Sequence, residues 1–213
     1  MLAKIALESP THSAAVNRKA FMIEGLGLNL DKLSSTLVKK TENDLNPRGE
    51  TLNDIHEKVS KDYALYGGYA LKITWGLDGY IAYVEHLPFE QVRKGEPNEC
   101  GETEYYVISN NWNEDMATKY EFTYSLPAFN PSYYKDGIAV SAAGVPQPTE
   151  EQLQQAVQVI YKYDYTPSAS SGLDFYPIPD YWAGLDAVLT YPYQYFHLIK
   201  CSLKVRCRLI KLS

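Results

Sequence analysis

The sequence predicts a mixed α+β fold, with helices flanking antiparallel strands and hairpins. Along its 213 residues, segments with apolar side chains at helical spacing alternate with segments in which every second side chain is apolar. Glycine pairs and clusters of Pro, Ser and Asn separate these segments, as expected for turns and loops. A hydrophobic content of 45% is sufficient for a sizeable core. No uninterrupted apolar run is long enough to predict a transmembrane helix.

The first predicted helix covers residues 9–24. Ser9 or Thr11 can cap its N-terminus, and Gly25 and Gly27 end it. The alternating leucines that follow predict a short strand: Leu26, Leu28 and Leu30. The polar residues 38–50, punctuated by Pro47 and Gly49, predict a surface loop.

The second predicted helix covers residues 51–66. Thr51 and Asp54 have the spacing of a capping box, and the glycine pair Gly67 and Gly68 stops the helix. Its apolar stripe consists of Leu52, Ile55, Val59, Tyr63 and Tyr66. This stripe is expected to face the core.

Period-two alternation then predicts strands. A hairpin of residues 69–75 and 80–87 is expected around a turn at 76–79. Further strands are expected at residues 104–109, 119–125 and 157–165, with an Asn-rich turn around Trp112. The Pro-, Gly-, Ser- and Ala-rich residues 127–148 predict a long irregular loop, and residues 149–155 a short helix. Asp180 can cap a helix beginning at Tyr181.

The charge is unevenly distributed. A formal net charge of -6 argues against a general phosphate-binding surface. The tail from residue 197 onward nevertheless contains no Asp or Glu, and its cations are candidate DNA contacts: Lys200, Lys204, Arg206, Arg208 and Lys211. A small DNA-binding module using this tail is therefore one alternative function, and an accidental extension of the reading frame is another explanation of the tail.

The N-terminus and the cysteines indicate synthesis in a cytoplasm. Lys4 and Glu8 interrupt what would be the apolar part of an export signal. Cys100, Cys201 and Cys207 are odd in number and lack a Cys-x-x-Cys spacing, so reduced thiols are expected, with neither a disulfide framework nor a zinc site.

No ionisable motif predicts catalysis, a cofactor or a bound metal. His86 is next to Glu85, but neighbouring side chains of a strand point to opposite faces. Phosphate loops, dinucleotide fingerprints and serine-hydrolase elbows are missing from the sequence. The alternative of a carbohydrate- or nucleic-acid-active enzyme would need a pocket that joins His86 with Asp62 or Glu57.

Nineteen tyrosines point to contact surfaces. Tyrosine rings serve as platforms for sugars and bases, and they also suit protein interfaces, where the ring is buried and the hydroxyl stays wet. Asp and Glu accompany the tyrosine-rich stretches, whereas nucleic-acid stacking surfaces interleave basic residues. A protein interface is the favoured interpretation, and carbohydrate binding stays open.

Four segments, in the same order along the chain, resemble portal proteins of tailed phages. Residues 9–19 with 23–28 (Ile-Glu-Gly-Leu-Gly-Leu) resemble the family's early helix and strand. Residues 61–75, Lys-Asp-Tyr-Ala-Leu-Tyr-Gly-Gly-Tyr-Ala-Leu-Lys-Ile-Thr-Trp, are the most specific and look like its helix, small-residue turn and strand. Residues 82–93 are similar to its strand, proline and polar turn. Residues 175–186 resemble its step into a wing helix, particularly in portal-like proteins of phages and prophages of Bacteroidetes-type hosts.

The resemblance implies a wing-like α+β domain over residues 1–188, in a subunit of a dodecameric ring at one capsid vertex. DNA is packaged and ejected through such a ring, and terminase, capsid and head-completion proteins are its partners. The implied location is the virion, with no membrane association. The resemblance supplies no catalytic residues and no cofactor.

Residues 189–213 depart from the family pattern. A portal would continue the helix that starts near Tyr181 and then provide stem and clip, whereas Pro192 interrupts the helix and a basic, Cys-containing tail follows. We therefore expect an N-terminal wing-region fragment whose tail derives from a frameshift after about residue 188. Translation of the other two reading frames tests this: the hypothesis fails if neither continues the helix.

Overall fold

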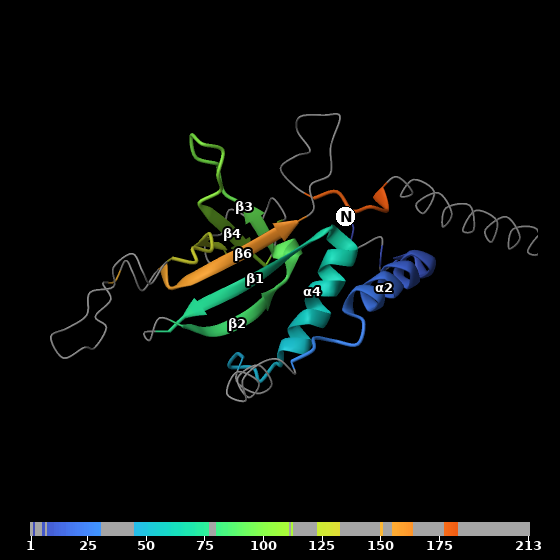
Figure 1. The fold of residues 1–213 in the computed structure, drawn as a ribbon. Coiled ribbons are helices and arrows are strands. Elements are labelled where there is room, and N and C mark those ends of the chain that lie inside the picture. The colour runs from blue at the N-terminus through green and yellow to red at the C-terminus, as the bar shows by residue number, and fades with distance from the viewer. Residues whose placement is uncertain are drawn as a thin grey trace, which may run out of the picture.

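The computed structural model describes residues 8–30, 45–76, 80–110, 112, 123–132, 155–163 and 177–182, together with Leu2, Ala6 and Glu150. Within these residues, one long α-helix packs on one of two small antiparallel sheets, and a second long α-helix packs on the first (Figure 1). The predicted α+β class, with helices flanking strands and hairpins, is confirmed.

Helix α2, Pro10–Glu24, begins at the predicted position. Of the two candidate caps, Ser9 is the one used: its hydroxyl accepts a hydrogen bond from the amide of His12 at 3.4 Å. Gly25, at φ 61°, ends the helix, and its amide donates to the carbonyl of Phe21. A positive φ of this kind is unfavourable for residues with a Cβ, which explains the glycine.

The short strand predicted from the leucines after α2 is wrong. Residues 27–30 have no regular secondary structure. Gly27 adopts φ 87°, and the amide of Leu28 donates to the side-chain oxygen of Asn53 at 2.9 Å. In a strand this amide would instead donate to a backbone carbonyl of a neighbouring strand. The spacing of three leucines is too short a pattern to override this local geometry.

Helix α4, Leu52–Tyr66, has the predicted capping box. The amide of Asp54 donates to the Thr51 hydroxyl at 3.1 Å, and the amide of Thr51 donates to the Asp54 carboxylate at 2.8 Å. The backbone amide and the hydroxyl of Thr51 both donate hydrogen bonds to the Asp54 carboxylate, and these two bonds lower the pKa of Asp54. Gly67, in the left-handed region, ends the helix.

Helix α4 lies between α2 and the sheet, so it buries more than the one predicted stripe (Figure 1). Of that stripe Ile55 is buried, whereas the other four side chains are partly exposed. Ala64, fully buried, packs against Val16 and Ala20 of α2, with Leu65 and Tyr181 at the edge of the contact. Small residues at this crossing allow the two helices to approach closely.

The first sheet has the order β2-β1-β6, with both pairs antiparallel. Its strands are β1, Gly68–Trp75, β2, Ile81–Leu87, and β6, Val157–Tyr163. The predicted hairpin is confirmed, with a register shift between Thr74 and Trp75. The predicted strand at residues 157–165 is confirmed as far as Tyr163, since the last two residues lie outside the described residues.

The second sheet has the order β3-β4-β5. Its strands are β3, Val92–Lys94, β4, Tyr105–Ser109, and β5, Thr123–Pro127, and the 3-10 helix η1, Phe89–Gln91, leads into it from β2. The strand predicted at 119–125 is confirmed at residues 123–125 and continues to Pro127, whereas residues 119–122 lie outside the described residues.

Pairing continues into the segment that the sequence assigned to an irregular loop. Ala128 forms a parallel bridge with Val159, and the amide of Phe129 donates to the carbonyl of Val159 at 3.0 Å. The loop prediction is wrong at its first residues, because this backbone satisfies the outer edge of β6 and joins the two sheets. Residues 133–148 lie outside the described residues.

Residues 45–50 of the predicted surface loop are irregular but not all on the surface. Leu45 and Asn46 are buried, because the Leu45 carbonyl accepts from the amide of Val84 and the Asn46 side chain reaches the Val84 carbonyl. This loop therefore covers the outer edge of β2, which would otherwise expose unpaired backbone.

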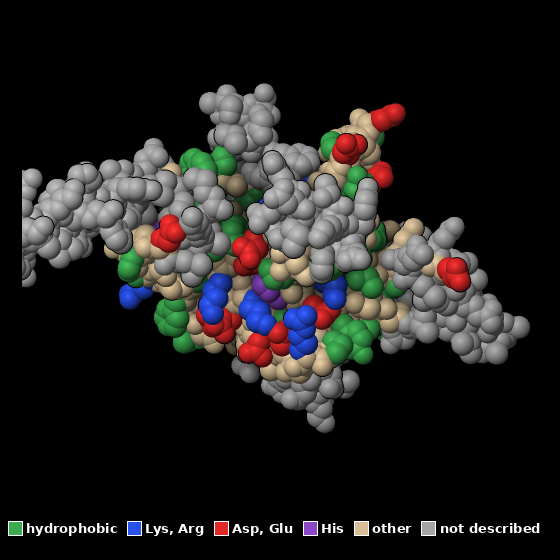
Figure 2. Space-filling view, turned by 180° about the vertical axis from the view of Figure 1, so that it is seen from behind, with side chains coloured by type: hydrophobic (Ala, Val, Ile, Leu, Met, Phe, Trp, Pro, Cys, Tyr) green, Lys and Arg blue, Asp and Glu red, His purple; other side chains and the backbone are tan. Residues whose placement is uncertain are grey.

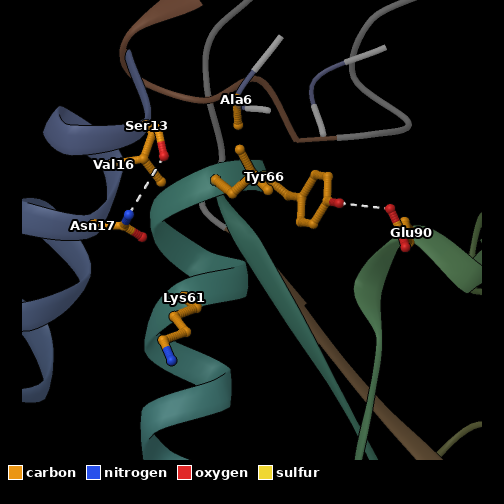
Figure 3. Close-up of a pocket in the computed structure, with 8 residues that line it drawn as sticks. Ala6, Ser13, Val16, Asn17, Lys61, Tyr66 and Glu90 are labelled. Carbon is orange, nitrogen blue, oxygen red and sulfur yellow. Dashed lines mark hydrogen bonds between the residues drawn. The ribbon is translucent and has the colours of Figure 1, made fainter. Parts of the chain in front are cut away.

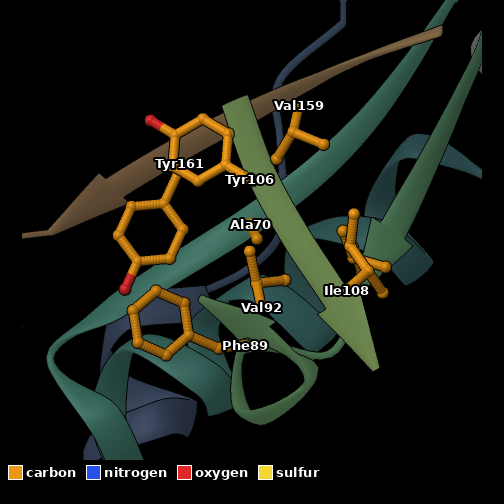
Figure 4. Packing of buried hydrophobic residues seen from close by; sticks show 8 residues of the cluster. Ala70, Phe89, Val92, Tyr106, Ile108, Val159 and Tyr161 are labelled. Carbon is orange, nitrogen blue, oxygen red and sulfur yellow. The ribbon is translucent and has the colours of Figure 1, made fainter. Parts of the chain in front are cut away.

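The main core lies between the two sheets (Figure 4). It contains Ala70, Leu87, Phe89, Val92, Tyr106, Ile108, Val159 and Tyr161. The ring of Tyr161 stacks between Phe89, at 4.8 Å, and Tyr106, at 5.2 Å. A Cβ on Gly68 would lie 2.8 Å from the Phe89 ring, so this stack also explains the second glycine after α4.

The predicted elements near the C-terminus are described in part. Glu150 and Gln155 are helical, with the residues between them outside the described part of the chain. Residues 177–179 have no regular secondary structure, and Asp180 and Tyr181 form a turn, while the remainder of the helix expected from Tyr181 lies outside the described residues. The proposed division at residue 188 is likewise beyond it.

The capping box of α4 provides a first test. The substitution Thr51→Ala should lower the free energy of unfolding by about 1 kcal/mol, because the Asp54 amide loses its acceptor. Thr11→Ala is the matched control, since Thr11 is exposed in the first turn of α2 and does not cap it. The control should change the free energy by less than about 0.5 kcal/mol. Equal losses in chemical denaturation would contradict this assignment of the caps.

Candidate functional site

Asp62 is the residue at which three elements meet. Its Oδ2 lies 2.8 Å from Nε2 of His86 on β2, and it accepts a hydrogen bond from the backbone amide of Phe89 at 3.0 Å. The side chains of Asp62 and His86 are only 15% and 13% exposed. Pro88 has no amide hydrogen, so the amide of Phe89 is the first donor after β2. One carboxylate thus connects α4 with β2 and with the start of the second sheet.

Glu85 and His86 point to opposite sides of β2, as the sequence predicts. The carboxylate of Glu85 pairs with Lys72, which lies opposite it on β1, and lies 3.9 Å from the guanidinium of Arg48. His86 is directed instead to Asp62. The two residues therefore do not form an acid and base pair with one another.

The structure brings His86 together with Asp62, one of the two carboxylates named for the enzyme alternative. Asp62 and His86 are in contact, whereas Glu57 pairs with Lys61 at 2.5 Å on an exposed part of α4. The hydrogen bonds of Asp62 connect α4 with His86 on β2 and with the amide of Phe89 at the start of η1. The arrangement acts chemically as a buried, hydrogen-bonded joint.

A second set of ion pairs fastens residues 45–50 to α4. The Lys58 ammonium donates to the carboxylate of Glu50, and the amide group of Asn46 donates to the same carboxylate at 2.7 Å. The hydrogen bond from Lys58 is the main cause that lowers the pKa of Glu50. Asn46 also accepts from the amides of Arg48 and Glu50, which makes the turn before Pro47 and Gly49 compact.

The surface formed by these pairs has charges of both signs. Figure 2, the view from behind, shows Lys and Arg side chains interspersed with Asp and Glu around a histidine. A surface that binds nucleic acid would instead present cations without neighbouring carboxylates. The described part of the chain therefore uses its charges mainly for intramolecular pairing on this face.

A cavity of about 320 Å³ lies between α2, α4 and Glu90 (Figure 3). The described residues that line it are Ala6, Ser13, Val16, Asn17, Lys61, Leu65, Tyr66 and Glu90. The Tyr66 hydroxyl donates to the Glu90 carboxylate at 2.8 Å. Burial, followed by the Glu90 hydrogen bond, raises the pKa of Tyr66, so its hydroxyl remains a protonated donor. The side-chain hydrogen bonds between the described lining residues run from Asn17 to Ser13 and from Tyr66 to Glu90.

No protein-family model matches the chain, and no curated protein matches it.

The remaining predicted site residues lie outside the described part of the chain. They are the candidate DNA contacts Lys200, Lys204, Arg206, Arg208 and Lys211, and the tail cysteines Cys201 and Cys207. Cys100 is exposed on the turn between β3 and β4. Within the described residues no group of three potential metal ligands occurs. A search of the same residues finds no helix suited to cross a membrane.

The polar contacts of Asn46, and the pair of Tyr66 with Glu90, were not predicted. An Asn directly before Pro47 is a signal for a side-chain-stabilised turn, so the role of Asn46 had a local signature. Tyr66 and Glu90 are 24 residues apart and belong to different elements, so no spacing rule connects them.

The Glu50 pair gives a prediction that depends on pH. Because the folded pKa of Glu50 is lowered, its contribution is fully present above the ordinary glutamate pKa and is lost as pH falls through the folded value. Glu50→Gln should lower the free energy of unfolding at pH 7 by roughly 0.5–1 kcal/mol, a size that allows for the partial exposure of Lys58. The difference from the wild type should shrink toward pH 3.

The matched control is Glu57→Gln, which breaks an exposed pair on the same helix. Its effect at pH 7 should stay below about 0.5 kcal/mol. Urea denaturation of both variants at pH 7 and pH 3 measures these differences. A Glu50→Gln loss that is equal at the two pH values would show that the charge of Glu50 is not what stabilises the loop.

Proposed function

We propose that this chain is a structural subunit of a tailed-phage portal ring and supplies its wing-like α+β domain, without a catalytic role. The observation on which the proposal depends is the order of the four portal-like segments along the chain. Three of them fall on consecutive elements: the first on α2, the second on the end of α4 with Gly67, Gly68 and β1, and the third on β2 with Pro88 and η1.

The use of the ionisable residues supports a structural role. Asp62, His86, Glu85 and Glu50 all contact residues of other elements and hold helices, loop and strands together. A structural subunit needs such contacts between its elements, because it must keep one shape while force passes between neighbouring subunits.

The exposed side chains support assembly. Large apolar or aromatic residues are exposed at several sites: Phe21, Met22, Leu26, Tyr80, Tyr83, Tyr105, Tyr124 and Trp182. Tyr and Trp are enriched at protein interfaces, where the ring is buried against a partner. The expected partners are further copies of the same subunit, in a ring of about twelve by the family resemblance, with terminase, capsid and head-completion proteins. Double-stranded DNA passes through such a ring within the virion.

Electron microscopy tests the proposal. The protein translated from the complete parental gene should form closed rings of uniform subunit number when purified at capsid-like salt concentrations. Only monomers under those conditions would count against it. The neighbouring genes give an independent check, because a large terminase upstream and a capsid protein downstream are expected; a locus without either would contradict the proposal.

A further inference from the structure

Three consecutive apolar side chains precede Glu24 in the C-terminal turn of α2. Ala20, just before them, packs against α4, whereas Phe21, Met22 and Ile23 are 65%, 68% and 38% exposed. Successive helical residues point about 100° apart, so these three side chains lie on the sides of α2 that do not face α4. Large apolar side chains that are exposed together are candidates for burial against a partner.

The residues that follow enlarge this surface. Leu26 is fully exposed and Leu28 is 40% exposed. Their position is fixed by the backbone, because Gly25 and Gly27 have positive φ and the amide of Leu28 is held by Asn53. We call Phe21, Met22, Ile23, Leu26 and Leu28 the α2 tip. Contiguous exposed patches of this kind mark sites of association.

A second surface of complementary chemistry lies on the turn between β3 and β4. The ring of Tyr105, 39% exposed, covers the backbone of Gly95, where a Cβ would lie only 2.4 Å from it. Exposed glutamates lie on the same turn: Glu96, Glu99, Glu102 and Glu104. Asn98 fixes the turn, since its side-chain oxygen accepts from the amides of Cys100 and Glu102. We call residues 95–105 the acidic hairpin.

The two surfaces are on opposite sides of the molecule. Figure 1 shows α2 and α4 on one side of the β2-β1-β6 sheet, with the β3-β4-β5 sheet and its projecting hairpin on the other. In the view from behind, carboxylates lie on a projecting lobe (Figure 2). The α2 tip of one copy therefore cannot reach its own acidic hairpin, but it can reach that of another copy.

The charges beside the two surfaces match. Arg18 is exposed and stands four residues before Met22, on the same side of α2. In the described part of the chain neither Arg18 nor the glutamates at 96, 99 and 102 belong to an ion pair. Methionine and phenylalanine pack favourably on a tyrosine ring, and arginine pairs with carboxylates.

We infer that the α2 tip of one copy docks on the acidic hairpin of the next copy of this chain. Two different surfaces meet in such a contact, so it is a head-to-tail contact, the type that closes into a ring or continues as a filament. The inference rests on the proposed function in taking a second copy as the partner. It goes beyond the proposed function by naming the two surfaces through which the copies meet, the α2 tip and the acidic hairpin.

Disulfide trapping tests the contact, because Cys100 already stands on the acidic hairpin. In the full chain with Cys201→Ser and Cys207→Ser, the substitution Met22→Cys should give a ladder of covalent multimers under mild oxidation. Adding Cys100→Ser should abolish the ladder. The matched control is Thr11→Cys, at an exposed position on the other end of α2, which should give none. Met22 is exposed, so its replacement leaves the fold intact.

A charge exchange provides the second measurement. Arg18→Glu should weaken self-association in sedimentation by about tenfold, and Glu99→Arg with Glu102→Arg should restore it in the same chain. Equal cross-linking of Met22→Cys and Thr11→Cys, or no ladder from either, would overturn the inference. So would an Arg18→Glu effect that the exchange does not reverse.

The outcomes separate this inference from the proposed function. Closed rings without Met22→Cys to Cys100 cross-links would leave the portal proposal standing and overturn the contact. Cross-linked copies that form only open chains would support the contact and count against a portal ring.

Discussion

The hydrogen bonds of the Asp62 carboxylate are the constraint on which the rest of the structure depends. A charge that is largely removed from water is costly unless donors surround it, and here the His86 ring and the Phe89 amide provide them. These hydrogen bonds determine where the neighbouring elements lie. The carboxylate fixes α4 against β2 and fixes the point at which the chain leaves β2 for η1. Phe89 then enters the core between Tyr66 and Tyr161, and the second sheet follows from it.

The parts of this arrangement that could be predicted are those with a signal in the nearby sequence. The capping box at Thr51, the glycines after each helix and the alternation around Gly76 specify α2, α4 and the first hairpin within a few residues of sequence. The strand predicted from the alternation of Leu26, Leu28 and Leu30 was wrong, because a positive φ at Gly27 and the hydrogen bond that the Leu28 amide donates to Asn53 determine the backbone there. Contacts between distant residues had no sequence signal. Asp62 and His86 are 24 positions apart, and the pairing of Ala128 with Val159 depends on how the two sheets meet.

The candidate site and the exposed surface contain different kinds of side chain. Several of the chain's described carboxylates and cations connect different elements, among them Asp62 with His86 and Glu85 with Lys72, whereas the side chains left to solvent include large apolar and aromatic groups. An enzyme concentrates unsatisfied, convergent polar groups in a pocket, whereas an assembly subunit exposes apolar surface for its neighbours. The exposed apolar and aromatic side chains therefore support the proposal of an assembly subunit. The α2 tip and the acidic hairpin are the clearest instance, since they face opposite sides of one molecule.

A double-mutant cycle on Asp62 and His86 tests most directly that the ionisable residues at this junction hold the fold together. The free energy of unfolding would be measured for the wild type, Asp62→Ala, His86→Ala and the double variant. The structural account predicts a coupling of about 1–3 kcal/mol, with the double variant little less stable than Asp62→Ala, because the two side chains act through one contact. Additive losses would mean that Asp62 and His86 stabilise the protein independently, and would contradict the account.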